Sequence, residues 1–164
     1  MTRGLRISAL CALSSLLLLG SGAAAGAEEV QVRSAAGVAT ISTIPPKVKQ
    51  ECNIQQDLSA SVVANAPNAK LAPKKPSSGL YLDLVVTEVH APGGGIFSGP
   101  KWIAARGTLQ QDEKKLRSFR VKRISGGPFT GTCAMLAKAT NAMGLDIAGW
   151  LADENAGSLL GDAQ

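Results

Sequence analysis

Aromatic residues are scarce in this sequence, where Phe, Trp and Tyr together make up 4% of 164 residues. A core must therefore be built mainly from Leu, Ile, Val and Ala, with few large side chains to fill it. The same scarcity weighs against a surface that stacks nucleobases. We expect no nucleic-acid partner.

Histidine is almost absent, because His90 is the only one in the chain. With so few nitrogen and sulfur ligands, the sequence predicts neither a metal site nor a cofactor. Asp83 and Glu88 lie five positions apart in a strand pattern, so they are expected on opposite faces and form no catalytic carboxylate pair. The glycine-rich stretches "PGGGIFSGP" and "SGGPFTGT" lack the P-loop lysine and the dinucleotide fingerprint. They favour turns, although backbone N–H groups of the second could face an anion at a helix start.

The first 27 residues have the three parts of an export signal. Arg3 and Arg6 give a positive start, residues 7–19 are mostly apolar, and "GSGAAAGA" supplies a small-residue cleavage site after Ala27. The apolar run is shorter than the roughly 20 residues that a membrane span needs. The sequence therefore predicts a Sec signal peptide over residues 1–27, a periplasmic location, and no transmembrane span after cleavage.

The rest of the chain has the size of one domain. The formal net charge of +5 falls to +3 when the two signal-peptide arginines are removed, so the exported chain is only mildly basic. We expect a flexible N-terminal segment over 28–47, a single domain over 48–152, and a C-terminal tail over 153–164.

The cysteines suggest a disulfide. Cys11 lies in the signal peptide and lacks the context of a lipidation site, which leaves Cys52 and Cys133 as an even pair in an exported chain. Closing a loop of this length would stabilise the fold by roughly 4 kcal/mol. The alternative is a nucleophilic thiol, because Cys133 follows a glycine-rich loop at a helix start and His90 could act as its base.

The periodicity predicts the order strand, helix, three strands, helix. The first helix would be capped by Asp57, a polar loop would cover 68–79, and a bulge is expected near Thr87–Glu88. The predicted elements are strand 48–54, helix 58–65, strands 79–89, 101–110 and 116–124, and helix 132–152. This order predicts an α+β two-layer sandwich, in which an antiparallel sheet of about four strands carries two helices on one face.

Two surfaces are candidates for binding. One is the glycine-rich connection at 90–101 with its neighbouring aromatic residues, and the other is a basic hairpin over 114–123. That hairpin could meet a polyanion, or it could simply protect a sheet edge. The candidate binding residues are His90, Gly93, Gly94, Gly95, Phe97, Trp102, Arg120 and Lys122.

The stretches "LDLVVTEVHAPGGGIFSGPKWIAARGTL" and "GPFTGTCAMLAKATNAMGLDIAGWL" resemble an uncharacterised family of small exported proteobacterial proteins, over about 52–151. The strand–helix order is also similar to that of periplasmic accessory domains of envelope assembly, such as penicillin-binding-protein activators and curli secretion components. Those proteins are usually lipid-anchored, whereas this chain has no lipidation site.

The sequence therefore predicts a non-enzymatic periplasmic binding or accessory protein of the bacterial cell envelope. Its expected partner is an envelope protein or an anionic envelope component. Two alternatives stay open: a small hydrolase or transferase that uses Cys133 and His90, and an effector-like protein that is released into the medium.

Overall fold

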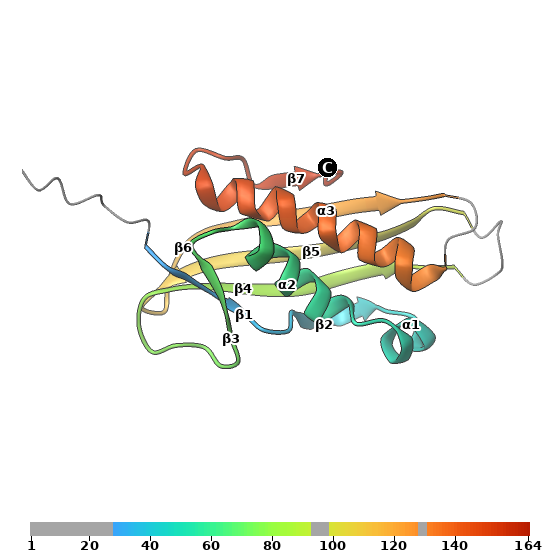
Figure 1. The fold of residues 1–164 in the computed structure, drawn as a ribbon, viewed down its shortest axis with the longest axis horizontal. Helices are drawn as coiled ribbons and strands as arrows, with labels where there is room; N and C mark the ends of the chain where they lie inside the picture. Colours follow the sequence, from blue (N-terminus) through green and yellow to red (C-terminus); the bar gives the residue numbers. More distant parts are fainter. Residues whose placement is uncertain (1–27, 93–98, 128–130) are drawn as a thin grey trace, which may run out of the picture.

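The computed structural model describes residues 28–92, 99–127 and 131–164 (Figure 1). These residues form three helices and a mixed sheet. The helices are α1 (Pro46–Glu51), α2 (Ile54–Asn65) and α3 (Thr132–Ala152). The strands are β1 (Val30–Arg33), β2 (Gly37–Thr43), β3 (Ala69–Ala72), β4 (Leu80–His90), β5 (Lys101–Gln111), β6 (Lys114–Ser125) and β7 (Leu159–Gly161).

The sheet is built around the long antiparallel strands β4, β5 and β6. β1 and β2 follow one another along the free edge of β4 and run parallel to it, and β3 lies outside β1. β7 closes the other side, parallel to β6. The described residues thus form seven strands in a mixed sheet, so the prediction of about four antiparallel strands is correct only for the central meander.

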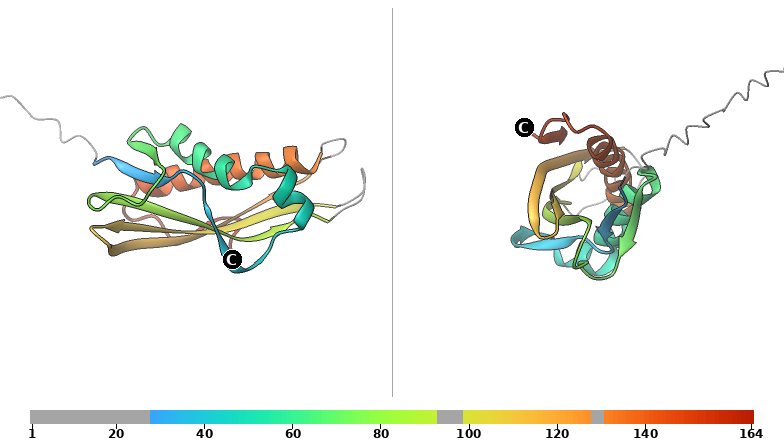
Figure 2. Two further views of the ribbon diagram at one scale, coloured as in Figure 1. Left: turned by 90° about the horizontal axis from the view of Figure 1, so that it is seen from below. Right: turned by 90° about the vertical axis from the view of Figure 1, so that its left-hand side faces the viewer.

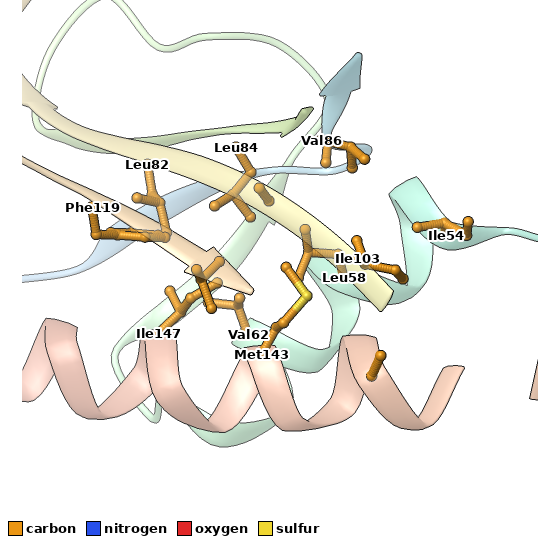
Figure 3. Close-up of a cluster of buried hydrophobic side chains, with 14 of the residues drawn as sticks. Ile54, Leu58, Val62, Leu82, Leu84, Val86, Ile103, Phe119, Met143 and Ile147 are labelled. Carbon is orange, nitrogen blue, oxygen red and sulfur yellow. The ribbon is translucent and has the colours of Figure 1, made fainter. Parts of the chain in front are cut away.

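α2 and α3 lie side by side across one face of this sheet (Figures 1 and 2). The strands alternate accordingly: Leu82, Leu84 and Ile103 point toward the helices and are buried. In Figure 3, Val62 of α2 and Met143 of α3 meet these strand residues in one apolar cluster. Burying each such side chain contributes about 1.5–3 kcal/mol, which explains how a chain poor in aromatics supports a core.

Close contact between α2 and α3 depends on Gly144. A Cβ at this position would lie 2.7 Å from the backbone carbonyl carbon of Ser61 and would collide with the Ser61 side chain. The Ser61 hydroxyl donates a hydrogen bond to the Asn141 carbonyl at 3.3 Å, which links the helices at the same crossing.

The C-terminal end of α3 is held by the hairpin of β5 and β6. Phe119 covers Gly107 and meets the Trp150 ring edge to face at 4.7 Å between centroids. Arg117 lies over the same Trp150 ring and donates hydrogen bonds to the carbonyls of Trp150, Asp153 and Glu154 at 2.9–3.0 Å. A cation here satisfies carbonyls that a helix end leaves unpaired.

A second arginine of β6 connects three elements. Arg123 donates to both carboxylate oxygens of Asp146 on α3, at 2.7 and 2.6 Å, and its guanidinium lies 3.7 Å from Asp162 after β7. The hydrogen bond that Arg123 donates to Asp146 is the main cause of a raised pKa for Arg123. Partial desolvation lowers this pKa, and the negative charges of Asp146 and Asp162 raise it further. The side chains of Arg117 and Arg123 therefore lie on the helix-covered face of the sheet, where both bind α3.

The predicted disulfide between Cys52 and Cys133 is present, with 5.3 Å between the Cα atoms. Its attachment differs from the expectation that it would join a first strand to the last helix. Residues 48–54 were expected to be a strand, but Pro46 begins α1, and Cys52 caps that short helix. Proline suits the first turn of a helix because its missing N–H is not needed there. The bridge therefore joins the α1–α2 connection to the first turn of α3.

One other local prediction was partly right and three were wrong. The 28–47 segment was expected to be a flexible tail or a loose edge strand, and it contains the strands β1 and β2, with β1 hydrogen-bonded between β3 and β4. The loop 68–79 contains β3, and the tail 153–164 contains β7. The residue before α2 is Asn53 rather than Asp57, which lies inside the helix. The strands β1, β3 and β7 have only three or four residues, and each pairs in parallel with a strand that is remote in sequence.

Replacement of Gly144 by Ala should lower the free energy of unfolding by about 1–3 kcal/mol, because the added methyl group forces the two helices apart. The matched control is Gly149→Ala on the same helix, where nothing lies within 4 Å of the new Cβ. That change should raise stability by up to about 1 kcal/mol through helix propensity. Urea denaturation measures both. Equal effects of the two substitutions would contradict the close helix crossing.

Removal of the disulfide by Cys52→Ser with Cys133→Ser should lower the free energy of unfolding of the exported chain by about 2–5 kcal/mol. Reduced wild-type protein is the control and should match the double variant. Intact mass and thiol titration check the bridge directly in protein recovered from the periplasm. Two reactive thiols in that native protein would rule the bridge out.

Candidate functional site

The face of the sheet opposite α2 and α3, called the open face below, is bare of described helices (Figure 2). Its side chains alternate with the buried ones on each central strand. The open face includes Asp83, Val85, Glu88 and His90 of β4, Trp102, Ala104, Arg106 and Thr108 of β5, and Ser118, Arg120, Lys122 and Ile124 of β6.

A bulge in β4 places His90 on the open face. Leu82, Leu84 and Val86 face the helices, so strict alternation would turn His90 toward the core. The pairing with β5 shifts between Val86 and Glu88, as expected near Thr87–Glu88, and this extra residue reverses the alternation. Val89 then returns to the core, and His90 pairs directly with Trp102.

Trp102 and three side chains around it come from three adjacent strands. The His90 ring stacks on the Trp102 ring with 3.6 Å between centroids and 9° between planes. The indole Nε1 donates to Glu88 Oε1 at 2.9 Å, and the Lys122 ammonium lies 4.9 Å from the Trp102 centroid. These four residues, Glu88, His90, Trp102 and Lys122, are called the Trp102 cluster. It is a preorganised group that combines aromatic rings with both signs of charge.

The structure thus brings together three of the predicted binding residues, His90, Trp102 and Lys122. Arg120 lies on the same face and is exposed. Gly93, Gly94, Gly95 and Phe97 lie outside the described residues. The basic hairpin is more divided than predicted, because Arg117 and Arg123 bind α3 while Arg120 and Lys122 lie on the open face.

Two residues of this face were missed in the sequence. Glu88 was assigned no role, and the shift in alternation at Thr87 was the signal that places it beside His90. Arg106 was also missed, although it occupies the same alternating face of its strand as Trp102 and lies directly opposite Arg120. Alternation within 101–110 was sufficient to identify its side of the sheet.

The proposed dyad of Cys133 and His90 lacks its nucleophile. Cys133 is bonded to Cys52, whereas nucleophilic catalysis requires a thiolate. The His90 ring is stacked on Trp102. Within 28–92, 99–127 and 131–164, no three His, Cys, Asp or Glu side chains are placed to hold a metal ion. None of the described helices is long and apolar enough to cross a membrane.

No protein-family model and no curated protein matches the chain at a significant level. Solved structures with a similar arrangement include the PelC dodecamer from Paraburkholderia phytofirmans, which is 11% identical with a TM-score of 0.45, the match covering 71% of this chain and 86% of that one. A DUF330 protein from Xanthomonas campestris is 17% identical with a TM-score of 0.48, covering 75% and 82%. A minor lipoprotein from Acinetobacter baumannii is 12% identical with a TM-score of 0.38, covering 75% and 91%. Such distant likeness does not carry a function from those proteins to this one.

Tyr81 is the only tyrosine of the chain, so its titration can be followed without overlap. It lies two residues from Asp83 in β4, and its pKa therefore responds to the charges at that end of the open face. Burial raises the pKa of its hydroxyl above the usual value of about 10, and the Asp83 charge raises it further, while Arg33 lowers it. The folded state therefore holds this proton more tightly than the unfolded state. The resulting contribution to stability is complete below about pH 10 and is lost as the pH rises through the folded-state pKa.

Alkaline titration followed by tyrosinate absorbance should therefore give a midpoint above about 10 in native protein and near 10 in urea. Asp83→Asn should lower the native midpoint, because it removes a negative charge, whereas Arg33→Gln should raise it. A native midpoint equal to that of the urea-unfolded chain, or the same direction of change in both variants, would contradict this environment.

Proposed function

We propose that the protein is a non-enzymatic binding protein of the bacterial cell envelope, which acts in the periplasm and holds its ligand against the open face of the sheet. The observation that carries this proposal is the Trp102 cluster, where ring stacking and a 2.9 Å hydrogen bond hold an aromatic surface in place on a face that none of the described helices covers. Prearranged side chains lose little conformational freedom when a ligand binds.

The charge of the open face favours an anionic partner. Three cations lie on it, Arg106, Arg120 and Lys122, together with two carboxylates, Asp83 and Glu88. Asp83 is already bound by Arg33, and Glu88 accepts a hydrogen bond from Trp102. The two other arginines of β6, Arg117 and Arg123, are already bound to α3. The proposed ligand is therefore an anionic envelope component. An envelope protein that presents acidic side chains is the alternative.

Export supports the periplasmic part of the proposal. Residues 1–27 have the pattern of a signal peptide, and the Cys52–Cys133 disulfide is of the kind that persists in oxidising compartments. The bridge also argues against the cysteine-dependent hydrolase, because it occupies the required sulfur. Fractionation of the expressing cells distinguishes the periplasmic protein from an effector that is released into the medium.

Sedimentation with washed envelope fragments tests the proposal. Lys122→Glu reverses a charge within the Trp102 cluster, and it should reduce retention of the purified protein roughly fivefold or more if an anionic component binds there. Lys138→Glu is the matched control, because Lys138 is exposed on α3, the helix that covers the other face of the sheet.

The wild type and Lys138→Glu should be retained equally, and Trp102→Ala should lose retention while remaining folded by circular dichroism. Retention that is the same for all four proteins, or absent for the wild type, would overturn the proposal.

A further inference from the structure

Two arginines lie directly opposite each other on the open face. Arg106 of β5 pairs with Arg120 of β6 in the antiparallel register, and both are exposed. Like charges at directly opposed positions destabilise a sheet. The arrangement is therefore unfavourable for the protein alone and becomes favourable when an anion lies between the two guanidinium groups.

Neither guanidinium is in a salt bridge with a carboxylate of the described residues. The other arginines differ: Arg117 donates to helix carbonyls, and Arg123 binds Asp146. The nearby carboxylate of Asp83 is bound by Arg33 at 3.1 Å. Among the described residues, Arg106 and Arg120 thus have no carboxylate partner. Arg33 and Arg123 each bind a carboxylate, and Arg117 binds the carbonyls at the end of α3.

The two arginines line a groove of about 580 Å³, a volume in the range of small-ligand sites. Lys115 adds a third cation to its wall, and Asp83, whose carboxylate is bound by Arg33, adds one anion. Thr108 and Ser118, directly opposite each other and two positions from the arginines, add two hydroxyl groups that can donate hydrogen bonds. The groove therefore offers two guanidinium groups and two hydroxyl groups, one of each from β5 and one of each from β6.

We propose that this groove binds a phosphate-type dianion, with Arg106 and Arg120 donating to its oxygens from opposite sides and Thr108 and Ser118 beside them. A planar guanidinium presents paired donors that match the oxygens of a phosphate. Two guanidinium groups together match the charge of a phosphate dianion better than that of a monoanionic carboxylate ligand. The inference deepens the proposed binding function and rests on it, because it names the ligand chemistry and a second part of the open face.

A phosphomonoester can reach this groove as a soluble molecule or as a lipid headgroup. The experiment has an arm for each source: calorimetric titration with inorganic phosphate and glycerol 1-phosphate, and flotation with phosphatidic acid vesicles against phosphatidylcholine vesicles. All arms use the exported chain at one fixed ionic strength, because salt screens these charges. Acetate is the monoanionic comparator.

The variants are Arg106→Gln, Arg120→Gln and the double substitution, with Lys138→Gln as the matched loss of one charge on α3. The dissociation constant for phosphate groups should rise at least tenfold in each arginine variant and stay unchanged in the control. Without ligand, the arginine variants should be as stable as the wild type or more stable, because a repulsion is removed. A loss of binding is then not a loss of folding.

Binding of the soluble phosphates, or of phosphatidic acid vesicles alone, with this dependence on the arginines supports the inference and identifies the source. Equal binding by the wild type and the double variant, equal affinity for acetate, or no binding in any arm would overturn it. If envelope retention depends on Lys122 while no phosphate binds, the inference fails and the proposed function stands. If phosphate binds while envelope retention is absent, the envelope function fails instead.

Discussion

The packing of α2 and α3 on one face of the sheet is the constraint on which the rest of this structure depends. Gly144 allows the helices to touch, and the apolar side chains of β4 and β5 are buried beneath them. Because side chains alternate along a strand, burying one set commits the other set to the opposite face. The positions of Trp102, Arg106 and Arg120 therefore follow from the packing of residues that no ligand would touch.

The basic hairpin shows how this constraint divides residues of one chemical type. Arg117 and Arg123 attach α3 to the sheet. Arg117 donates hydrogen bonds to carbonyls at the C-terminal end of the helix, and Arg123 binds Asp146, so both charges stabilise the fold. Arg106, Arg120 and Lys122 belong to the other face, where the two arginines lie directly opposite each other and Lys122 lies over the Trp102 ring. A charge cluster in sequence thus becomes two surfaces with different roles. The bulge at Thr87 adds His90 to the exposed one.

Much of the central structure could be predicted from local pattern. Helix α3 has the predicted bounds, the three antiparallel strands follow from their alternation, and the cysteine pair forms the predicted bridge. The short strands could not be predicted, because β1 has four residues and its parallel partners begin at Ala69 and Leu80. Such strands are stabilised by neighbours remote in sequence rather than by their own pattern. For the same reason, the sequence assigned His90 and Trp102 to one candidate surface and Lys122 to another, and only the register of the sheet brings the three together.

We propose that ligands bind the open face and leave the helix-covered face untouched. Nuclear magnetic resonance of the arginine Nε–H groups during titration with glycerol 1-phosphate tests it most directly, because β5 and β6 carry arginines on both faces. The signals of Arg106 and Arg120 should move together and saturate, while those of Arg117 and Arg123 stay in place. Equal movement of all four signals, or movement of Arg117 and Arg123 alone, would contradict it.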